Sequence, residues 1–318
     1  MQSKLVISLD FELLWGVRDH ATRESYGANI LGARTAIPLM LELFEKYGVS
    51  ATWATVGFLF CRSRNELMDS LPPAELRPAY QDCRLSAYRY LDEVGMNEKE
   101  DPLYYGASLI ERIQQTPNQE IATHTLSHYY CLEPGQENAQ FEADLKAAIM
   151  LAGQREIDLY SIVFPRNQYS KEHLAICRKL GLKNYRGTPE QWIYRSVVGR
   201  DQTPMRRAGR LLDAHTGILG DTSFSNDASL PSNVPASQFL RPCAGKLAAF
   251  HPLHRSSLKR GMSRAAQTGR GYHLWWHPHN FGRGLEANLG GLEEILCHYR
   301  RLSDNFGMAS CTMAEAAQ

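Results

Sequence analysis

Two carboxylates near the start of the chain are the first residues that could do chemistry together. Asp10 and Glu12 stand two residues apart, directly after the apolar run 5–9. In a β-strand, residues i and i+2 project to the same face, so these two side chains can converge while Phe11 turns away. Two acids in a solvated loop have the same sequence pattern, so the pair alone leaves both interpretations open.

A second candidate is the pair of histidines in the segment HTLSH, residues 124–128. Imidazoles four residues apart lie on one face of a helical turn and can bind one metal ion. The glutamate of a HExxH metalloprotease is absent, because position 125 is a threonine. Together with Glu12 from another strand end, His124 and His128 would complete a set of three protein ligands. Such a set leaves one metal position open for water, as hydrolytic sites require.

Two further strand ends carry candidate groups. Arg166 follows the run 160–164, where its guanidinium could hold a carboxylate by two hydrogen bonds and keep it ionised. A surface arginine after a turn is the alternative. His277 ends the aromatic run 272–276 and is a candidate general acid, because imidazole titrates near neutral pH. His279 competes for that role, and a buried structural histidine is the alternative for both.

The elements that must position these residues alternate between strands and helices. Apolar runs predict strands at residues 5–9, 50–55, 120–123, 160–164 and 272–276. Helical patterns cover residues 35–47, 138–153, 170–180 and 289–301. This alternation predicts an α/β fold with a parallel sheet, in which ligand and catalytic groups gather at the carboxyl ends of the strands. We expect a single domain over residues 1–318, with irregular insertions at roughly 61–113 and 196–271.

Composition excludes several classes of protein. The 318 residues include 35 basic and 34 acidic side chains, so no nucleic-acid partner is expected. Seven cysteines without a CxxC pair favour free thiols in a reducing compartment. We expect no membrane span and no signal peptide, and therefore a cytoplasmic protein. Walker, GxGxxG and GxSxG motifs are absent, which excludes the usual nucleotide and serine-hydrolase sites.

Taken in chain order, these motifs resemble the polysaccharide deacetylase family, the NodB-homology carbohydrate esterases of family 4. The family's first motif, TFDDG, is similar to SLDFE at residues 8–12, which matches a D-x-E variant branch. The second, H-[ST]-x-x-H, is matched at residues 124–128. The third is loosely matched at residues 165–166, and the last, L-x-x-H, at residues 274–277. The resemblance implies a distorted, seven-stranded (β/α) barrel.

The resemblance also implies a role for each motif residue. One divalent metal ion, zinc or another, would have three protein ligands: Glu12, His124 and His128. The catalytic groups would be the base Asp10, the arginine that holds it, Arg166, and the general acid His277. Substrate contacts are expected from nearby rings and polar groups: Trp15, Trp276, His279 and Asn280.

The expected activity is metal-dependent hydrolysis of an N-acetyl or other N-acyl group of an amino sugar. Without an export signal, we expect a nucleotide- or lipid-linked sugar, or a growing surface polysaccharide such as a lipopolysaccharide O-antigen. The alternatives are hydrolysis of a small cyclic amide, a non-haem iron oxygenase using the same two histidines and carboxylate, and a degenerate member that binds sugar without turnover. The sequence leaves open the sugar, the acyl group, the native metal and the oligomeric state.

Overall fold

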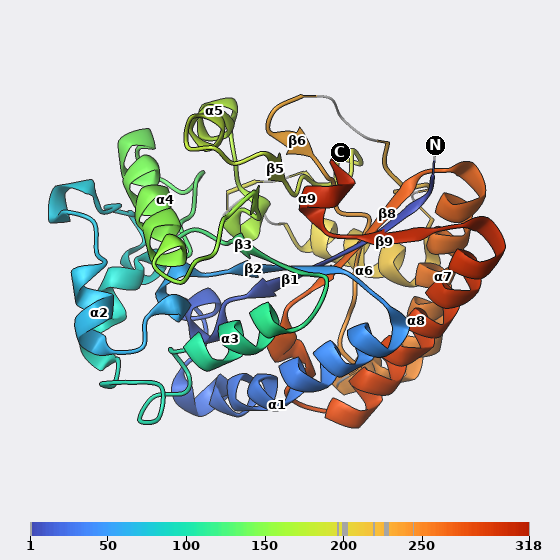
Figure 1. Ribbon diagram of the computed structural model, residues 1–318, viewed down its shortest axis with the longest axis horizontal. Helices are drawn as coiled ribbons and strands as arrows, with labels where there is room; N and C mark the ends of the chain where they lie inside the picture. The colour runs from blue at the N-terminus through green and yellow to red at the C-terminus, as the bar shows by residue number, and fades with distance from the viewer. Residues whose placement is uncertain are drawn as a thin grey trace.

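A curled parallel β-sheet runs through the centre of the molecule, and helices pack around it (Figure 1). The computed structural model describes residues 2–195, 197–198, 203–218, 220–225, 229–243 and 245–317. Nine strands lie in these residues: β1 (Lys4–Phe11), β2 (Ala51–Thr55), β3 (Gln119–Thr123), β4 (Ser161–Ile162), β5 (Asn184–Tyr185), β6 (Ser232–Asn233), β7 (Gln238–Phe239), β8 (Gly271–Trp276) and β9 (Ala309–Cys311). Their order is β6-β5-β4-β3-β2-β1-β8-β7, and β9 pairs with the start of β1; all these pairings are parallel.

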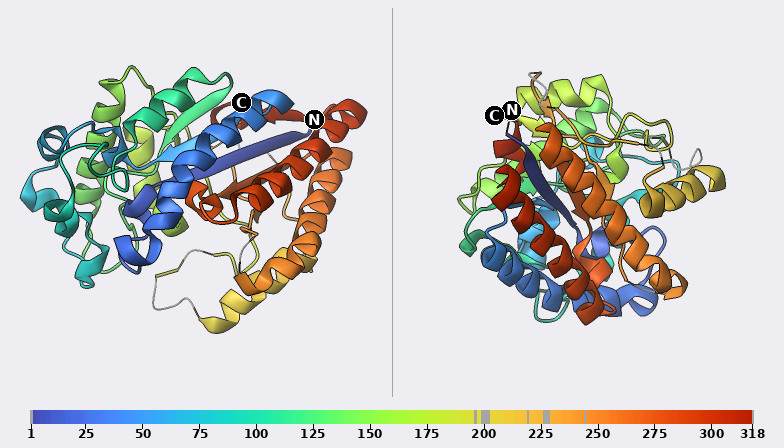
Figure 2. Two further views of the ribbon diagram at one scale, coloured as in Figure 1. Left: turned by 90° about the horizontal axis from the view of Figure 1, so that it is seen from below. Right: turned by 90° about the vertical axis from the view of Figure 1, so that its right-hand side faces the viewer.

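Helices cover the outer side of the sheet. Those in the described part of the chain are α1 (Arg23–Tyr47), α2 (Arg64–Asp69), α3 (Ala107–Gln115), α4 (Asn138–Gly153), α5 (Lys171–Lys179), α6 (Pro204–Thr216), α7 (His251–Thr268), α8 (Leu285–Phe306) and α9 (Met313–Ala316). α8 packs between α1 and α7 along one flank (Figure 2). Within the described residues, no helix has the length and apolar character needed to cross a membrane.

The first strand is the centre of the sheet. Leu5, Ile7 and Leu9 are fully buried, as expected for a strand covered on both faces. β1 pairs with β8 on one side, and with β2 and β9 on the other. Because these neighbours run parallel to β1, the residues that follow each of them emerge at one edge of the sheet.

The segment 232–239 joins the two sides of the curled sheet. At β6 it pairs with β5, and at β7 it pairs with β8. Between these strands, the Val234 N–H donates to the Tyr185 carbonyl over 2.9 Å, and the Ser237 N–H donates to the His273 carbonyl over 2.8 Å. One stretch of chain therefore forms the wall between β5 and β8.

The predicted α/β barrel with a parallel sheet is confirmed, with three differences in detail. Nine strands are described instead of seven. The stretch 196–271, expected to be irregular, contains α6, α7, β6 and β7 in its described part. α1 also begins well before the predicted residue 35, because Gly27 and Ala33 on its buried face gave no strong apolar pattern. The division into one domain with two insertions stays a prediction.

Candidate active site

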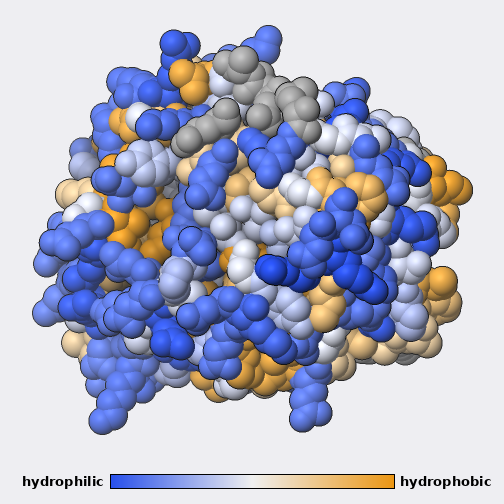
Figure 3. All heavy atoms as spheres, turned by 45° about the vertical axis from the view of Figure 1, so that its right-hand side comes forward, coloured by the Kyte–Doolittle hydropathy of each residue, from blue (hydrophilic) through white to orange (hydrophobic). Residues whose placement is uncertain are grey.

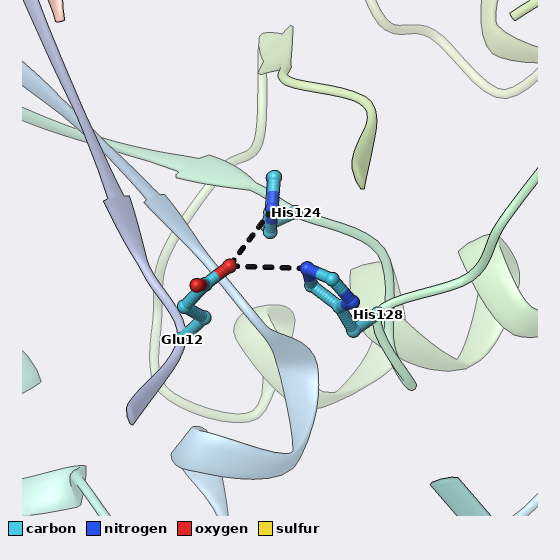
Figure 4. Close-up of side chains that lie close together, drawn as sticks. All are labelled: Glu12, His124 and His128. Carbon is cyan, nitrogen blue, oxygen red and sulfur yellow. Dashed lines mark hydrogen bonds and ion pairs between the residues drawn. The ribbon is translucent and has the colours of Figure 1, made fainter. Parts of the chain in front are cut away.

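Three side chains converge at the carboxyl ends of β1 and β3 (Figure 4). The Nε2 atom of His128 lies 3.0 Å from Oε2 of Glu12, and the Nε2 atom of His124 lies 3.5 Å from the same oxygen. One ligand atom from each residue lies within 4.8 Å of the others, and all three side chains are buried. The structure thus brings together the three residues that the sequence predicted as metal ligands.

The protonation of this cluster suits a metal site. Burial raises the pKa of Glu12, but His277 and the hydrogen bonds with His124 and His128 outweigh burial and hold the pKa well below its usual range. Burial lowers the pKa of His128 to about 4, so this imidazole is neutral at pH 7. His124 donates from Nδ1 to the Val163 carbonyl over 2.7 Å, which leaves its Nε2 lone pair directed at the cluster.

The two histidines converge through a loop rather than the predicted helical turn. Thr125 and His128 both have left-handed backbones, with φ of 64° and 57°. A buried carboxylate from α4, Asp144, holds the loop between them. It accepts hydrogen bonds from the Leu126 N–H at 2.7 Å and from the Ser127 N–H at 3.2 Å, and a third from the Ser127 hydroxyl. The left-handed residues reverse the chain, and Asp144 fixes the reversal.

Asp10 forms a buried two-pronged ion pair with Arg186, which follows β5. The Arg186 nitrogens donate to the two oxygens of Asp10 over 2.6 and 2.8 Å. Burial raises the pKa of Asp10, but Arg186 and nearby histidines outweigh burial and lower it. The guanidinium also lies over the Trp275 ring, 4.2 Å from its centroid. Asp10 is therefore an ionised carboxylate with a fixed orientation.

The prediction that Arg166 holds Asp10 was wrong. Arg166 and the residue after it have left-handed backbones, with φ of 54° and 53°, so the chain turns sharply after β4. The Arg166 guanidinium instead pairs with Asp19 and Glu133 and lies over the Tyr130 ring. Arg166 lines the cavity. The ion pair with Asp10 is formed instead by Arg186, which follows the next strand along the chain, β5.

A second layer of polar groups holds Arg186. One of its nitrogens donates to the Ser8 hydroxyl over 2.9 Å, and that hydroxyl lies 2.8 Å from Nε2 of His273. Since His273 donates from Nδ1 to the Val234 carbonyl, its Nε2 accepts the Ser8 proton. Burial, followed by the charge of Arg186, lowers the pKa of His273 to about 3, so it stays neutral. Sequence reasoning missed this layer, because its members come from separate strands.

His277 and His279 approach Oε1 of Glu12, whereas His124 and His128 approach Oε2. The His277 Nε2 atom is 3.7 Å from both Oδ2 of Asp10 and Oε1 of Glu12, and about a quarter of the side chain is exposed. The His279 Nδ1 atom is 3.9 Å from Oε1 of Glu12, and its ring stacks on His277. Burial, followed by His277, lowers the pKa of His279 to about 3. Both rings line the cavity, and His277 is the more accessible of the two to a ligand.

A cavity of about 460 Å³ opens over these groups. Beside the residues already described, its walls include His20, Tyr26, Phe239, Trp275 and Asn280. This volume lies within the usual range for small-molecule sites, about 300–1,000 Å³. His279 and Asn280, which the sequence predicted as substrate contacts, both line this cavity.

Two tryptophans predicted to contact substrate do not reach this cavity. Trp15 is fully buried and donates from Nε1 to the Tyr104 carbonyl over 2.9 Å. Trp276 is also fully buried, and its ring stacks on Phe281. Because neighbouring residues of a strand point to opposite faces, Trp275 is the one that faces the cavity.

Solved structures share this architecture. A "putative polysaccharide deacetylase" from Mycobacterium smegmatis has a TM-score of 0.61 and 13% identity, covering 99% of this chain and 89% of that one. A "probable polysaccharide deacetylase" from Pseudomonas aeruginosa PAO1 has a TM-score of 0.54 and 10% identity, covering 99% and 88%. The chain has the polysaccharide-deacetylase fold. The structure is also similar to that of Puue allantoinase, with a TM-score of 0.53 and 10% identity, covering 99% of this chain and 89% of that one. No protein-family model and no curated protein matches the sequence.

Proposed function

We propose that the protein is a metal-dependent hydrolase that removes an N-acetyl or other N-acyl group from an amino sugar. The observation that carries this proposal is the convergence of Glu12, His124 and His128 beside the Asp10–Arg186 ion pair. Two imidazoles and one carboxylate form a ligand set used by hydrolytic zinc sites. The fold, which solved polysaccharide deacetylases share, supports the same class of reaction.

A divalent ion, with zinc as the first choice, would supply Lewis-acid polarisation of the acyl oxygen and a lowered pKa of its water. The three side chains fit this ion because Glu12 is ionised, His128 is neutral, and the Nδ1 proton of His124 is directed away from the cluster. His128 would bind the ion through Nε2, because this atom faces Glu12. Its buried Nδ1 has no hydrogen-bond partner among the residues that the structure describes.

Asp10 acts as the general base in this proposal. Arg186 keeps it ionised and directs its oxygens, while Ser8 and His273 restrain Arg186 from behind. An ionised carboxylate held beside the ligand cluster can accept the proton of an attacking water. His277 is placed 3.7 Å from Asp10, on the cavity side, where it can protonate the departing amine nitrogen.

The substrate would lie against Trp275 and Phe239, whose rings pack at 4.7 Å and line one wall of the cavity. An apolar wall of this kind suits the flat face of a sugar ring. Arg166 and Asn280 at the same cavity offer hydrogen-bond donors to its hydroxyl groups. A nucleotide- or lipid-linked amino sugar, or an O-antigen unit, is the substrate class we propose to assay first.

A small cyclic amide is the second candidate, because the fold is also similar to that of Puue allantoinase. The intact geometry of Asp10, Arg186 and His277 favours turnover over a binding protein without catalysis. The buried base beside the ligand cluster also favours a hydrolase over an iron oxygenase, which needs no such group.

Acetate release is the direct test. The protein would be stripped with a chelator, reloaded with zinc, and assayed on N-acetylated amino sugars and, in parallel, on cyclic amides. We expect zinc-dependent acetate release that His128→Ala abolishes. Ring opening of a cyclic amide without acetate release would select the second candidate. Activity on neither substrate class by a protein that holds zinc would contradict the proposed hydrolase.

A further inference from the structure

A glycine lies against the carboxylate of Glu12. Gly16 ends the short 3₁₀ turn Leu13–Gly16 that follows β1, and it lines the cavity. A Cβ atom at this position would lie 1.9 Å from Cδ of Glu12, and 2.2 and 2.3 Å from the two carboxylate oxygens. Carbon atoms in contact are normally about 3.5–4.0 Å apart. The carboxylate therefore occupies the space that a side chain at residue 16 would need.

A reversal of the chain after Glu12 brings Gly16 to this position. Leu13 has a left-handed backbone, with φ of 47°, so the chain turns sharply at the end of β1. The Trp15 N–H then donates to the Glu12 carbonyl over 3.1 Å, which closes the turn. Figure 4 shows Glu12 extending from the end of its strand toward the two histidines. The ligand and the glycine belong to one local structure, with the sequence ELLWG at residues 12–16.

Buried contacts hold the turn that carries Gly16. Nε1 of Trp15 donates to the Tyr104 carbonyl over 2.9 Å. The Trp15 ring is fully buried, with its centroid 4.6 Å from that of the Tyr104 ring and 4.8 Å from that of the Phe58 ring. Since this packing restrains the backbone of the turn, an added Cβ atom would displace the end of the flexible Glu12 side chain instead.

A displaced Glu12 carboxylate would lose its contacts with the ligand cluster. Oε2 lies 3.0 Å from Nε2 of His128 and 3.5 Å from Nε2 of His124. Oε1 lies 3.7 Å from Nε2 of His277 and 3.9 Å from Nδ1 of His279, so imidazoles flank both oxygens. Any shift that clears an added Cβ atom moves the carboxylate out of this arrangement.

We propose that Gly16 is a positioning residue for the metal ligand Glu12. Its missing side chain leaves room for the carboxylate beside both His124 and His128, so the ligand motif extends four residues beyond Glu12. Gly16 does not have a positive φ, so alanine could adopt the same backbone conformation. The close approach of Glu12, and not the backbone, is what requires glycine. This inference rests on the proposed function, because it assigns Glu12 to a metal site.

A double-variant comparison tests this role. Gly16→Ala would be made in the wild type and in Glu12→Ala, and the midpoint of urea unfolding would be measured on the metal-free proteins. In the wild type, Gly16→Ala should lower the midpoint, because the buried Glu12 carboxylate loses its hydrogen bond with His128. In the Glu12→Ala background it should leave the midpoint unchanged or raise it, since the carboxylate that opposes the methyl group is gone.

Zinc affinity measures the consequence for the ligand set. In competition with a zinc-binding dye, Gly16→Ala should bind zinc about 10–100-fold more weakly than the wild type. Gly290→Ala on α8 is the matched control, because an added Cβ atom there has no other atom within 4 Å. This control should bind zinc as the wild type does.

Two results would overturn the positioning role. Equal loss of unfolding stability from Gly16→Ala in both backgrounds would show that alanine disturbs the backbone and not Glu12. Wild-type zinc affinity in Gly16→Ala would show that the ligand does not need the glycine. Absence of zinc binding by the wild type would contradict the proposed function, whereas the unfolding comparison needs no metal and still decides whether Gly16 holds Glu12 in place.

Discussion

The candidate active site has two sides that are built differently. The ligand side consists of Glu12 and the loop 124–128, and one carboxylate from α4, Asp144, fixes that loop. The base side consists of Asp10 and Arg186, with a second layer drawn from β1, β8 and the segment 232–239. Both sides are buried. The ligand side depends on a local chain reversal, whereas the base side depends on how distant strands are placed.

This difference predicts how each side fails when it is changed. Loss of a group on the base side should reduce turnover or stability while metal still binds. Loss of the support on the ligand side should reduce metal affinity first. The surface in Figure 3, where hydrophilic side chains surround separate hydrophobic patches, offers exposed positions for control substitutions.

The largest expected effect comes from Asp10→Asn. General acid–base groups contribute about 10²–10⁴-fold to the rate, so we expect kcat to fall about 10³-fold. Metal content should not change, because Glu12 and the two histidines stay in place. Steady-state kinetics with metal analysis checks this prediction, with the exposed Asp158→Asn as the control. Loss of metal in Asp10→Asn would show that the two sides are not separable.

Arg186→Met should be the most destabilising change on the base side. It leaves the Asp10 carboxylate buried without its partner, which typically costs about 3–5 kcal/mol. Arg166→Met should cost no more than about 1 kcal/mol, because its ion pairs lie at a partly exposed rim. Urea denaturation of the two variants compares the arginines directly. Equal losses of unfolding free energy in the two variants would contradict the larger cost expected for breaking the buried Asp10–Arg186 pair.

Asp144→Asn tests the ligand side. The amide cannot accept all three hydrogen bonds from the loop, and loss of such support typically lowers metal affinity about 10–100-fold. Competition with a zinc-binding dye measures this change. An affinity equal to that of the wild type would show that the loop holds its shape without Asp144.

The Asp144 carboxyl should also make the stability of the metal-free protein depend on pH, and Asp144→Asn, which cannot titrate, is the comparison. Burial raises the pKa of Asp144 from 3.8 to about 6, so the folded protein holds this proton more tightly than the unfolded chain does. The contribution of this group is therefore greatest below pH 4, and it falls by about 3 kcal/mol as the pH rises through 6. The stability of the wild type relative to Asp144→Asn should fall over this window. A constant difference between pH 4 and pH 7 would contradict the raised pKa.

Ser8→Ala should have the smallest effect. It removes one hydrogen bond to Arg186 and one to His273, at a cost of about 1 kcal/mol in stability. kcat should fall less than about tenfold, because the two bonds from Arg186 to Asp10 stay in place. Ser127→Ala, which removes a hydroxyl from the ligand side, is the matched comparison and should alter zinc affinity instead. Loss of zinc affinity in Ser8→Ala would contradict the division between the sides.

The comparison also explains what the sequence could predict. The core strands appear as apolar runs, and the ligand residues appear as a short motif, so both could be predicted from local patterns. The left-handed backbones at Thr125 and His128 could not, because neither residue type requires that conformation. Arg186 follows a strand of only two residues, and no local pattern indicates that it reaches Asp10.

The choice between adjacent tryptophans shows the same limit. Trp275 and Trp276 lie in one strand, and the sequence does not say which face of β8 turns to the cavity. The register against β1 decides it, pairing Trp275 with Ser8 and Trp276 with Leu9. Residues that depend on register or on pairing between distant strands need the structure.

Metal content is the most direct test of the central claim. The purified wild type and His124→Ala would be loaded with zinc, dialysed, and analysed by inductively coupled plasma mass spectrometry, with exposed His20→Ala as the control. The proposed site predicts one equivalent of zinc in the wild type and in His20→Ala, and none in His124→Ala. Absence of metal from the wild type after loading, or its retention in His124→Ala, would contradict the metal centre and the hydrolase built on it.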